Sequence, residues 1–112
     1  MTAEKFRELA LSFPETEEKR HMNHPDFRVR GRIFATLSYP DEHWGMVKLP
    51  PEQQEAFVAL EPKAFEPVKG AWGRQGCTSV RLEQVKESTL RRALALAWEE
   101  AGRKKAAKEG RG

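Results

Sequence analysis

Apolar residues recur at helical spacing near the start of the chain. The set occupies positions i, i+3, i+4 and i+7: Phe6, Leu9, Ala10 and Phe13. With Thr2 as N-cap and Pro14 as a stop, this spacing predicts a helix over about residues 3–13.

A longer apolar stripe of the same kind lies near the end of the chain. Its members are Leu90, Ala93, Leu94, Ala97, Trp98 and Ala101. Ser88 can cap this helix and Gly102 is expected to close it. The register predicts that Trp98 faces the core.

The middle of the chain alternates apolar and polar residues instead, which is typical of strands. Segments 27–29, 33–39 and 44–49 are rich in aromatic and β-branched residues, and Gly31 and the "YPDEHWG" stretch separate them. We therefore expect a three-stranded antiparallel meander over residues 26–49.

The first turn of this meander can be built in two ways. A two-residue turn at Arg30 and Gly31 would pair Phe27 with Phe34. A three-residue loop over 30–32 would instead gather five apolar residues on one face: Phe27, Val29, Ile33, Ala35 and Leu37. The larger apolar face favours the three-residue loop.

A short helix and a further strand complete the pattern. Pro51 can begin a helix that ends before Pro62, with Ala56, Phe57 and Leu60 turned inward. A loop with Gly70, Gly73 and Gly76 follows, and residues 78–82 alternate as a strand. Without a repeated βαβ rhythm, this order predicts an α+β fold in which an antiparallel sheet packs against N- and C-terminal helices.

Four stretches together resemble the MmcQ/YjbR family: "FRELALSFPETEE", "HPDFRVRGRIFATL", "MVKLPPEQQEAFVALEP" and "GAWGRQGCTSVRL...LRRALALAWEEA". The resemblance covers about residues 3–102 and lies in the overall pattern rather than in a catalytic motif. It implies a CyaY-like fold, described as a double-wing DNA-binding architecture, in small bacterial proteins. It carries over no catalytic residue.

Charge is unevenly distributed along the 112 residues. Five bases and one acid give residues 103–112 a charge of +4, which leaves −1 for residues 1–102 against a total of +3. We expect a single domain over 1–102 followed by a basic C-terminal tail. No apolar run reaches the roughly 20 residues that a membrane helix needs, so the sequence predicts a cytoplasmic protein without a membrane partner. A monomer or weak homodimer is expected.

The double-wing architecture that the resemblance implies would place basic residues on two turns, the first hairpin and the Gly-rich loop. The candidate nucleic-acid contacts are Arg28, Arg30, Arg32, Lys69, Trp72 and Arg74. Exposed cations release counterions from phosphates and a Trp can stack on a base, so DNA is the leading predicted partner. The alternatives are a solvated hairpin tip, where charge prevents strand aggregation, and a Trp72 that plugs the core.

The histidines raise the question of a metal site. His21, His24 and Asp26, with the distant His43, could ligate a metal, but Pro25 favours extended backbone at His24 and no confirming ligand follows. We expect His24 to hydrogen-bond the backbone at the start of a strand. The acidic residues before Asp26, which could hold iron in a frataxin-like manner, are interleaved with bases. No metal or cofactor is predicted.

Cys77 is the single cysteine, so no internal disulfide can form. Paired with His24 or His43 it could form a Cys/His site, but the start of an apolar strand favours a small buried side chain. We expect a binding module rather than an enzyme. The alternative to DNA binding is a small-molecule or protein site in a cleft near the Gly-rich loop, where His24, Trp72 and Cys77 meet.

Overall fold

The computed structural model describes residues 1–111, with side chains described except at His21 and at 104–111. The strands of the described chain form one antiparallel sheet in the order β1-β2-β3-β4-β6-β5. They are β1 (Thr16–His21), β2 (His24–Val29), β3 (Arg32–Leu37), β4 (Trp44–Lys48), β5 (Phe65–Pro67) and β6 (Cys77–Arg81). The helices are α1 (Ala3–Leu11), α2 (Pro51–Leu60), α3 (Ala71–Arg74) and α4 (Glu87–Arg111). The predicted α+β class is confirmed.

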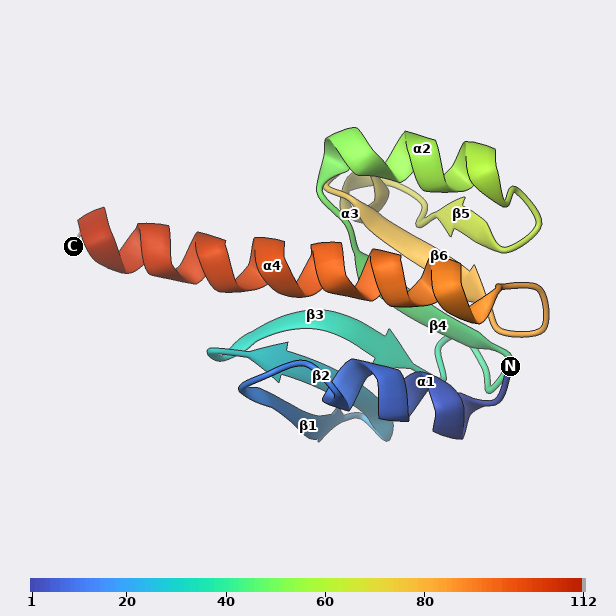
Figure 1. Ribbon diagram of the computed structural model, residues 1–112, viewed down its shortest axis with the longest axis horizontal. Helices are drawn as coiled ribbons and strands as arrows, with labels where there is room; N and C mark the ends of the chain where they lie inside the picture. The colour runs from blue at the N-terminus through green and yellow to red at the C-terminus, as the bar shows by residue number, and fades with distance from the viewer. Residues whose placement is uncertain (112) are drawn as a thin grey trace.

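The helices α1 and α4 lie side by side over one face of the sheet (Figure 1), and the core fills the space between. Phe6 of α1 and Leu90 and Leu94 of α4 are fully buried against Phe27 and Phe34 of the sheet. Burial of large apolar side chains is the main force that holds these layers together. The other face of the central strands is not covered by α1 or α4.

The N-terminal helix matches its prediction closely. The Thr2 side chain accepts a hydrogen bond from the Lys5 backbone N–H at 3.1 Å, which caps the first turn. The three buried residues of α1 are Phe6, Leu9 and Ala10. Phe13 lies just past the helix and stacks on Trp98 at 5.8 Å between ring centroids. Trp98 is only partly buried, and its indole N–H donates to the Pro14 carbonyl at 3.0 Å.

Two predictions about helices are wrong. Gly102 does not close α4, because the helix continues to Arg111. A glycine inside a helix costs only about 1 kcal/mol relative to alanine, and good helix formers surround this one. In α2 only Phe57 is buried, whereas Ala56 is exposed and Leu60 is 56% exposed.

The turn between β2 and β3 has two residues, so the favoured three-residue loop is wrong. Val29 pairs with Arg32, and Arg30 and Gly31 both have positive φ, at 52° and 81°. The register then shifts by one between the Arg28–Ile33 and Phe27–Ala35 pairs, because β3 has an extra residue there, Phe34. Such a bulge lets two consecutive residues point the same way, and Phe34 and Ala35 are both fully buried.

The structure contains three elements that the sequence pattern does not predict: β1, β5 and α3. The charged strand β1 forms one edge of the sheet and pairs along its whole length with β2. The short strand β5 forms the other edge beside β6. In the described part of the chain, no helix combines the length and apolar character needed to cross a membrane.

Candidate functional site

Strand alternation sends one set of side chains away from the helices. The cross-strand partners Asp26, Thr36, Met46 and Ser79 form a row over β2, β3, β4 and β6. Their neighbours along each strand, such as Phe27 and Val47, are fully buried in the core. Because successive side chains point to opposite faces of a sheet, this row lies on the face without α1 and α4.

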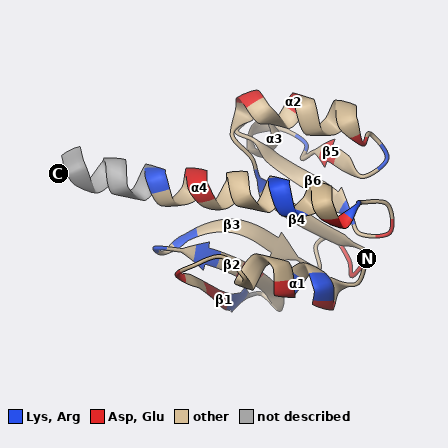
Figure 2. Cartoon of the chain, in the orientation of Figure 1, with Lys and Arg blue, Asp and Glu red and all other residues tan. Residues whose placement is uncertain are grey.

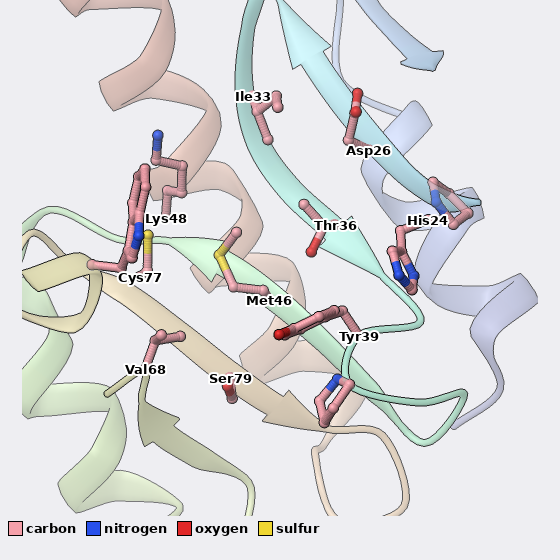
Figure 3. A pocket seen from close by; sticks show the side chains of 13 residues that line it. His24, Asp26, Ile33, Thr36, Tyr39, Met46, Lys48, Val68, Cys77 and Ser79 are labelled. Atoms are coloured by element: carbon pink, nitrogen blue, oxygen red, sulfur yellow. The ribbon is translucent and has the colours of Figure 1, made fainter. Parts of the chain in front are cut away.

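A pocket of about 490 Å³ lies over this row. Its lining residues are His24, Pro25, Asp26, Ile33, Thr36, Tyr39, Pro40, Met46, Lys48, Val68, Trp72, Cys77 and Ser79. His24 and Tyr39 lie at one end, and Lys48 and Cys77 at the other (Figure 3). The volume is in the range of pockets that enclose a small organic molecule.

The predicted meeting of His24, Trp72 and Cys77 in one cleft is therefore present in the structure. The backbone hydrogen bond predicted for His24 is not made by its Nδ1 atom, which is buried and has no partner among the described residues. The imidazole instead contacts the Tyr39 ring edge-on at 5.4 Å. A buried polar nitrogen without a partner is costly unless a ligand supplies one.

The pocket contains one carboxylate, and an arginine neutralises it. Asp26 is 2% exposed, and its two oxygens accept hydrogen bonds from Arg28 at 2.8 and 3.2 Å. The hydrogen bond to Asp26 raises the pKa of Arg28. Lys48, in contrast, has no carboxylate within 4.0 Å among the described residues. The free charge at this site is positive.

Cys77 is 4% exposed, as predicted for a small buried side chain. It is the cross-strand partner of Lys48. Burial raises the pKa of the Cys77 thiol, while the charge of Lys48 acts in the opposite direction. The thiol is therefore protonated near neutral pH and a weak nucleophile.

The Gly-rich loop is held close to the sheet, and this places Trp72. A Cβ on Gly73 would lie 1.7 Å from the Val68 carbonyl oxygen, and one on Gly76 would lie 1.8 Å from that of Leu49. The Gln54 amide also donates to the Gly73 and Cys77 carbonyls at 3.0 and 3.1 Å. These glycines serve close packing.

Trp72 itself is 63% exposed at the edge of the pocket, so its predicted alternative as a plug over the core is wrong. Its neighbour Gly73 is buried against the Val68 carbonyl, while the indole itself extends to the pocket edge. Tyr39, which also lines the pocket, is 65% exposed.

The basic residues predicted to contact DNA differ in whether a carboxylate already pairs with them and in how exposed they are. Arg28 binds Asp26, and Arg30 lies 3.7 Å from Glu15. Arg32 begins β3 and is partly buried. Lys69 and Arg74 are exposed on either side of Trp72 and have no ion pair with a described residue. Figure 2 shows basic residues at the β2-β3 hairpin with acidic residues nearby on the β1 side.

Several pocket residues were missed by the sequence analysis. They are Thr36, Tyr39, Met46, Lys48, Val68 and Ser79. The alternation of "WGMVK" and "CTSVR" already separates outward from inward positions. The alternation alone does not show that α1 and α4 cover only one face of the sheet, so it could not indicate which positions line a pocket. No group of three or more His, Cys, Asp or Glu side chains in the described part is arranged to hold a metal.

Helices on one face of an antiparallel sheet and a ligand-sized pocket on the other define a small α+β domain with an open sheet face. The YjbR family model matches residues 11–100, and the chain belongs to this family. The crystal structure of Deinococcus radiodurans protein DR2400, which has a DUF419 domain, has a similar fold, with a TM-score of 0.71 and 18% sequence identity. The match covers 87% of this chain and 75% of that one. No curated protein matches the chain. The predicted family is confirmed.

Proposed function

We propose that this protein is a non-catalytic binding module that holds a small organic molecule in the pocket on the open face of the sheet. The observation that carries the proposal is the pocket itself, about 490 Å³ in volume and lined mainly by apolar residues, with the unpartnered Nδ1 atom of His24 inside its wall. Pockets of this size with few polar groups are typical ligand sites.

The surroundings favour binding over catalysis. Trp72 and Tyr39 both line the pocket and are both exposed, and their aromatic rings suit a planar ligand. The His24 imidazole lies edge-on to the Tyr39 ring and adds aromatic surface to the same wall. Cys77 is the only thiol, and burial raises its pKa away from the range of an activated nucleophile.

A neutral fluorescent probe tests the pocket. N-phenyl-1-naphthylamine is expected to bind the wild-type protein with increased emission, and a Thr36→Phe variant should lose that signal because the new ring fills the pocket floor. Thr16→Phe makes the same change on β1, outside the pocket, and should bind as the wild type does. Equal binding by Thr36→Phe, with the fold intact by circular dichroism, would exclude the pocket as the site.

Nucleic acid is a second candidate partner, and the exposure of Trp72 between two exposed bases favours it. Lys69 and Arg74 can contact phosphates while the indole stacks on an unpaired base. Arg32 can add to this surface from the hairpin. Arg28 and Arg30, the other predicted contacts, already face Asp26 and Glu15 and contribute less.

The salt dependence of DNA binding tests this candidate. Replacing Lys69 and Arg74 by Met removes two cations, so the log–log salt slope for duplex DNA should flatten by about 2. A Lys63→Met and Lys86→Met pair removes the same charge elsewhere and should have little effect if the contacts are local. An unchanged slope in the first variant, or no binding by the wild type at low salt, contradicts a role of this surface in DNA binding.

A further inference from the structure

We propose that the molecule held in the pocket is an amphipathic organic anion, with an apolar planar body over Met46 and its carboxylate, sulfonate or phosphate group at Lys48. The inference rests on the proposed binding function and specifies the chemistry of the ligand.

The first argument is the balance of charge around the pocket. Of its ionised lining residues, Asp26 is neutralised by two hydrogen bonds from Arg28, and Lys48 has no carboxylate within 4.0 Å among the described residues. Glu100 borders a smaller hollow that Lys48 also lines, and it accepts a hydrogen bond from Arg103 at 2.6 Å. An apolar pocket with one free ammonium group selects an anion.

The second argument is where that charge lies. Lys48 is the cross-strand partner of Cys77, at the end of the pocket opposite His24 and Tyr39 (Figure 3). The row of Thr36, Met46 and Ser79 separates the two ends. A ligand that pairs with Lys48 therefore extends its body over Met46 towards the paired rings of His24 and Tyr39.

The effect of the charge is enhanced by its surroundings. Lys48 is partly buried among apolar and aromatic residues, so an ion pair formed there is less screened than one on the open surface. Desolvation of the anion opposes this gain, so the preference for the anion over a neutral molecule of the same shape is the difference between the two effects.

Two dyes with one skeleton separate charge from shape. N-phenyl-1-naphthylamine is neutral, and 8-anilino-1-naphthalenesulfonate is the same molecule with a sulfonate group. The wild type is expected to bind the sulfonate about tenfold more tightly. Lys48→Met, which retains the length of the side chain, should weaken the sulfonate by about the same factor and leave the neutral dye unchanged or tighter. Lys63→Met, with the same loss of charge at an exposed turn, should change neither.

Two further measurements locate the effect. The sulfonate should slow alkylation of Cys77 by iodoacetamide, because the dye and the thiol share one pocket, and Thr36→Phe should abolish sulfonate binding. If Lys48→Met does not fold, raised salt on the wild type replaces it: the sulfonate should weaken while the neutral dye holds.

The outcomes distinguish the two levels of the proposal. If neither dye binds, or if both bind Thr36→Phe as they bind the wild type, the pocket is not a ligand site and the proposed function fails. If the neutral dye binds in the pocket but the sulfonate binds no better, or if Lys48→Met has no effect on the sulfonate, the pocket binds neutral molecules and only the present inference is overturned.

Discussion

Asp26 shows how a single residue links the pocket to the hairpin. Its carboxylate is 2% exposed, lies in the pocket wall and receives both of its hydrogen bonds from Arg28, which was predicted as a DNA contact. A buried carboxylate needs such a partner, because its desolvation costs several kcal/mol. The arginine of the predicted wing is therefore engaged in keeping an acidic residue inside the sheet face.

We expect Asp26→Asn to destabilise the fold by about 2 kcal/mol, because it leaves the half-buried Arg28 without its charged partner. Urea denaturation measures the change. Glu8→Gln is the control, since this exposed carboxylate pairs with Lys5 at 3.7 Å on α1 and should contribute less than about 0.5 kcal/mol. Equal losses in the two variants would show that burial of Asp26 adds nothing.

The thiol of Cys77 gives a second prediction at this scale. Burial raises its pKa, so its alkylation by iodoacetamide should rise with pH at higher pH values than that of the same thiol in the urea-unfolded chain, which serves as the reference. Lys48→Met removes the charge that acts against burial and should move the rise higher still. Mass spectrometry across pH measures both profiles, and a rise at or below the pH of the reference thiol contradicts the argument.

The same shift has a consequence for stability. Because the folded state holds the Cys77 proton more tightly than the unfolded chain, the unfolded chain releases it first as pH increases. The contribution of Cys77 to the free energy of unfolding is therefore complete below the ordinary pKa of cysteine and decreases as pH rises above it.

At the scale of elements, periodic apolar patterns predicted the helices and strands that bury one face in the core. Both terminal helices and the strands β2, β3, β4 and β6 form at the segments that the sequence predicts, although α4 continues past Gly102 and the strand ends differ by up to three residues. The charged strand β1 has no apolar alternation, because it forms an edge and is held by its pairing with β2. The bulge at Phe34 was not predicted, because the comparison of a two-residue turn with a three-residue loop assumed that side chains alternate along β3 without interruption.

The site was predicted in part for the same reason. The meeting of His24, Trp72 and Cys77 follows from placing the Gly-rich loop beside the sheet. The close approach of Gly73 and Gly76 to the carbonyls of Val68 and Leu49, and the exposure of Trp72 beside them, are not revealed by any local pattern. The role of Lys48 requires knowing which face of β4 the helices leave open.

The continuity of α4 leads to a prediction at Gly102. This residue lies inside the helix, and outside the helix's own backbone an added Cβ would meet, among the described side chains, Val29 Cγ2 at an ordinary 3.9 Å. Gly102→Ala should therefore stabilise the protein, by about 0.5–1 kcal/mol, with increased helical ellipticity. Thermal unfolding monitored by circular dichroism tests it. A loss of stability would show that the helix ends at residue 102 after all.

At the scale of the whole molecule, the sheet separates two tasks. Phe6 packs on one side, close enough that a Cβ on Gly45 would lie 2.8 Å from its ring, and Met46 lies on the other side in the pocket. Phe6 is fully buried with the core cluster, and Met46 is only partly buried. The core and the proposed binding pocket therefore use different residues of the same strands.

A pair of truncations tests this separation. Phe6→Ala should cost about 3–5 kcal/mol of stability, and the fraction that remains folded should bind N-phenyl-1-naphthylamine with unchanged affinity. Met46→Ala should cost less than half as much but should weaken the dye clearly, because it removes the surface on which the dye rests. Denaturation and dye titration on both variants provide the comparison. A core variant with weakened dye affinity would contradict the division.

The glycine-held loop next to the pocket has a practical consequence for engineering. Its backbone is fixed by Gly73, Gly76 and the amide of Gln54, none of which needs the side chain of Trp72. The positions facing the opening, Thr36, Met46, Val68, Trp72 and Ser79, can thus be randomised together while the anchors are kept. A library of this kind would turn the domain into a scaffold without disulfides for selecting receptors of chosen small molecules.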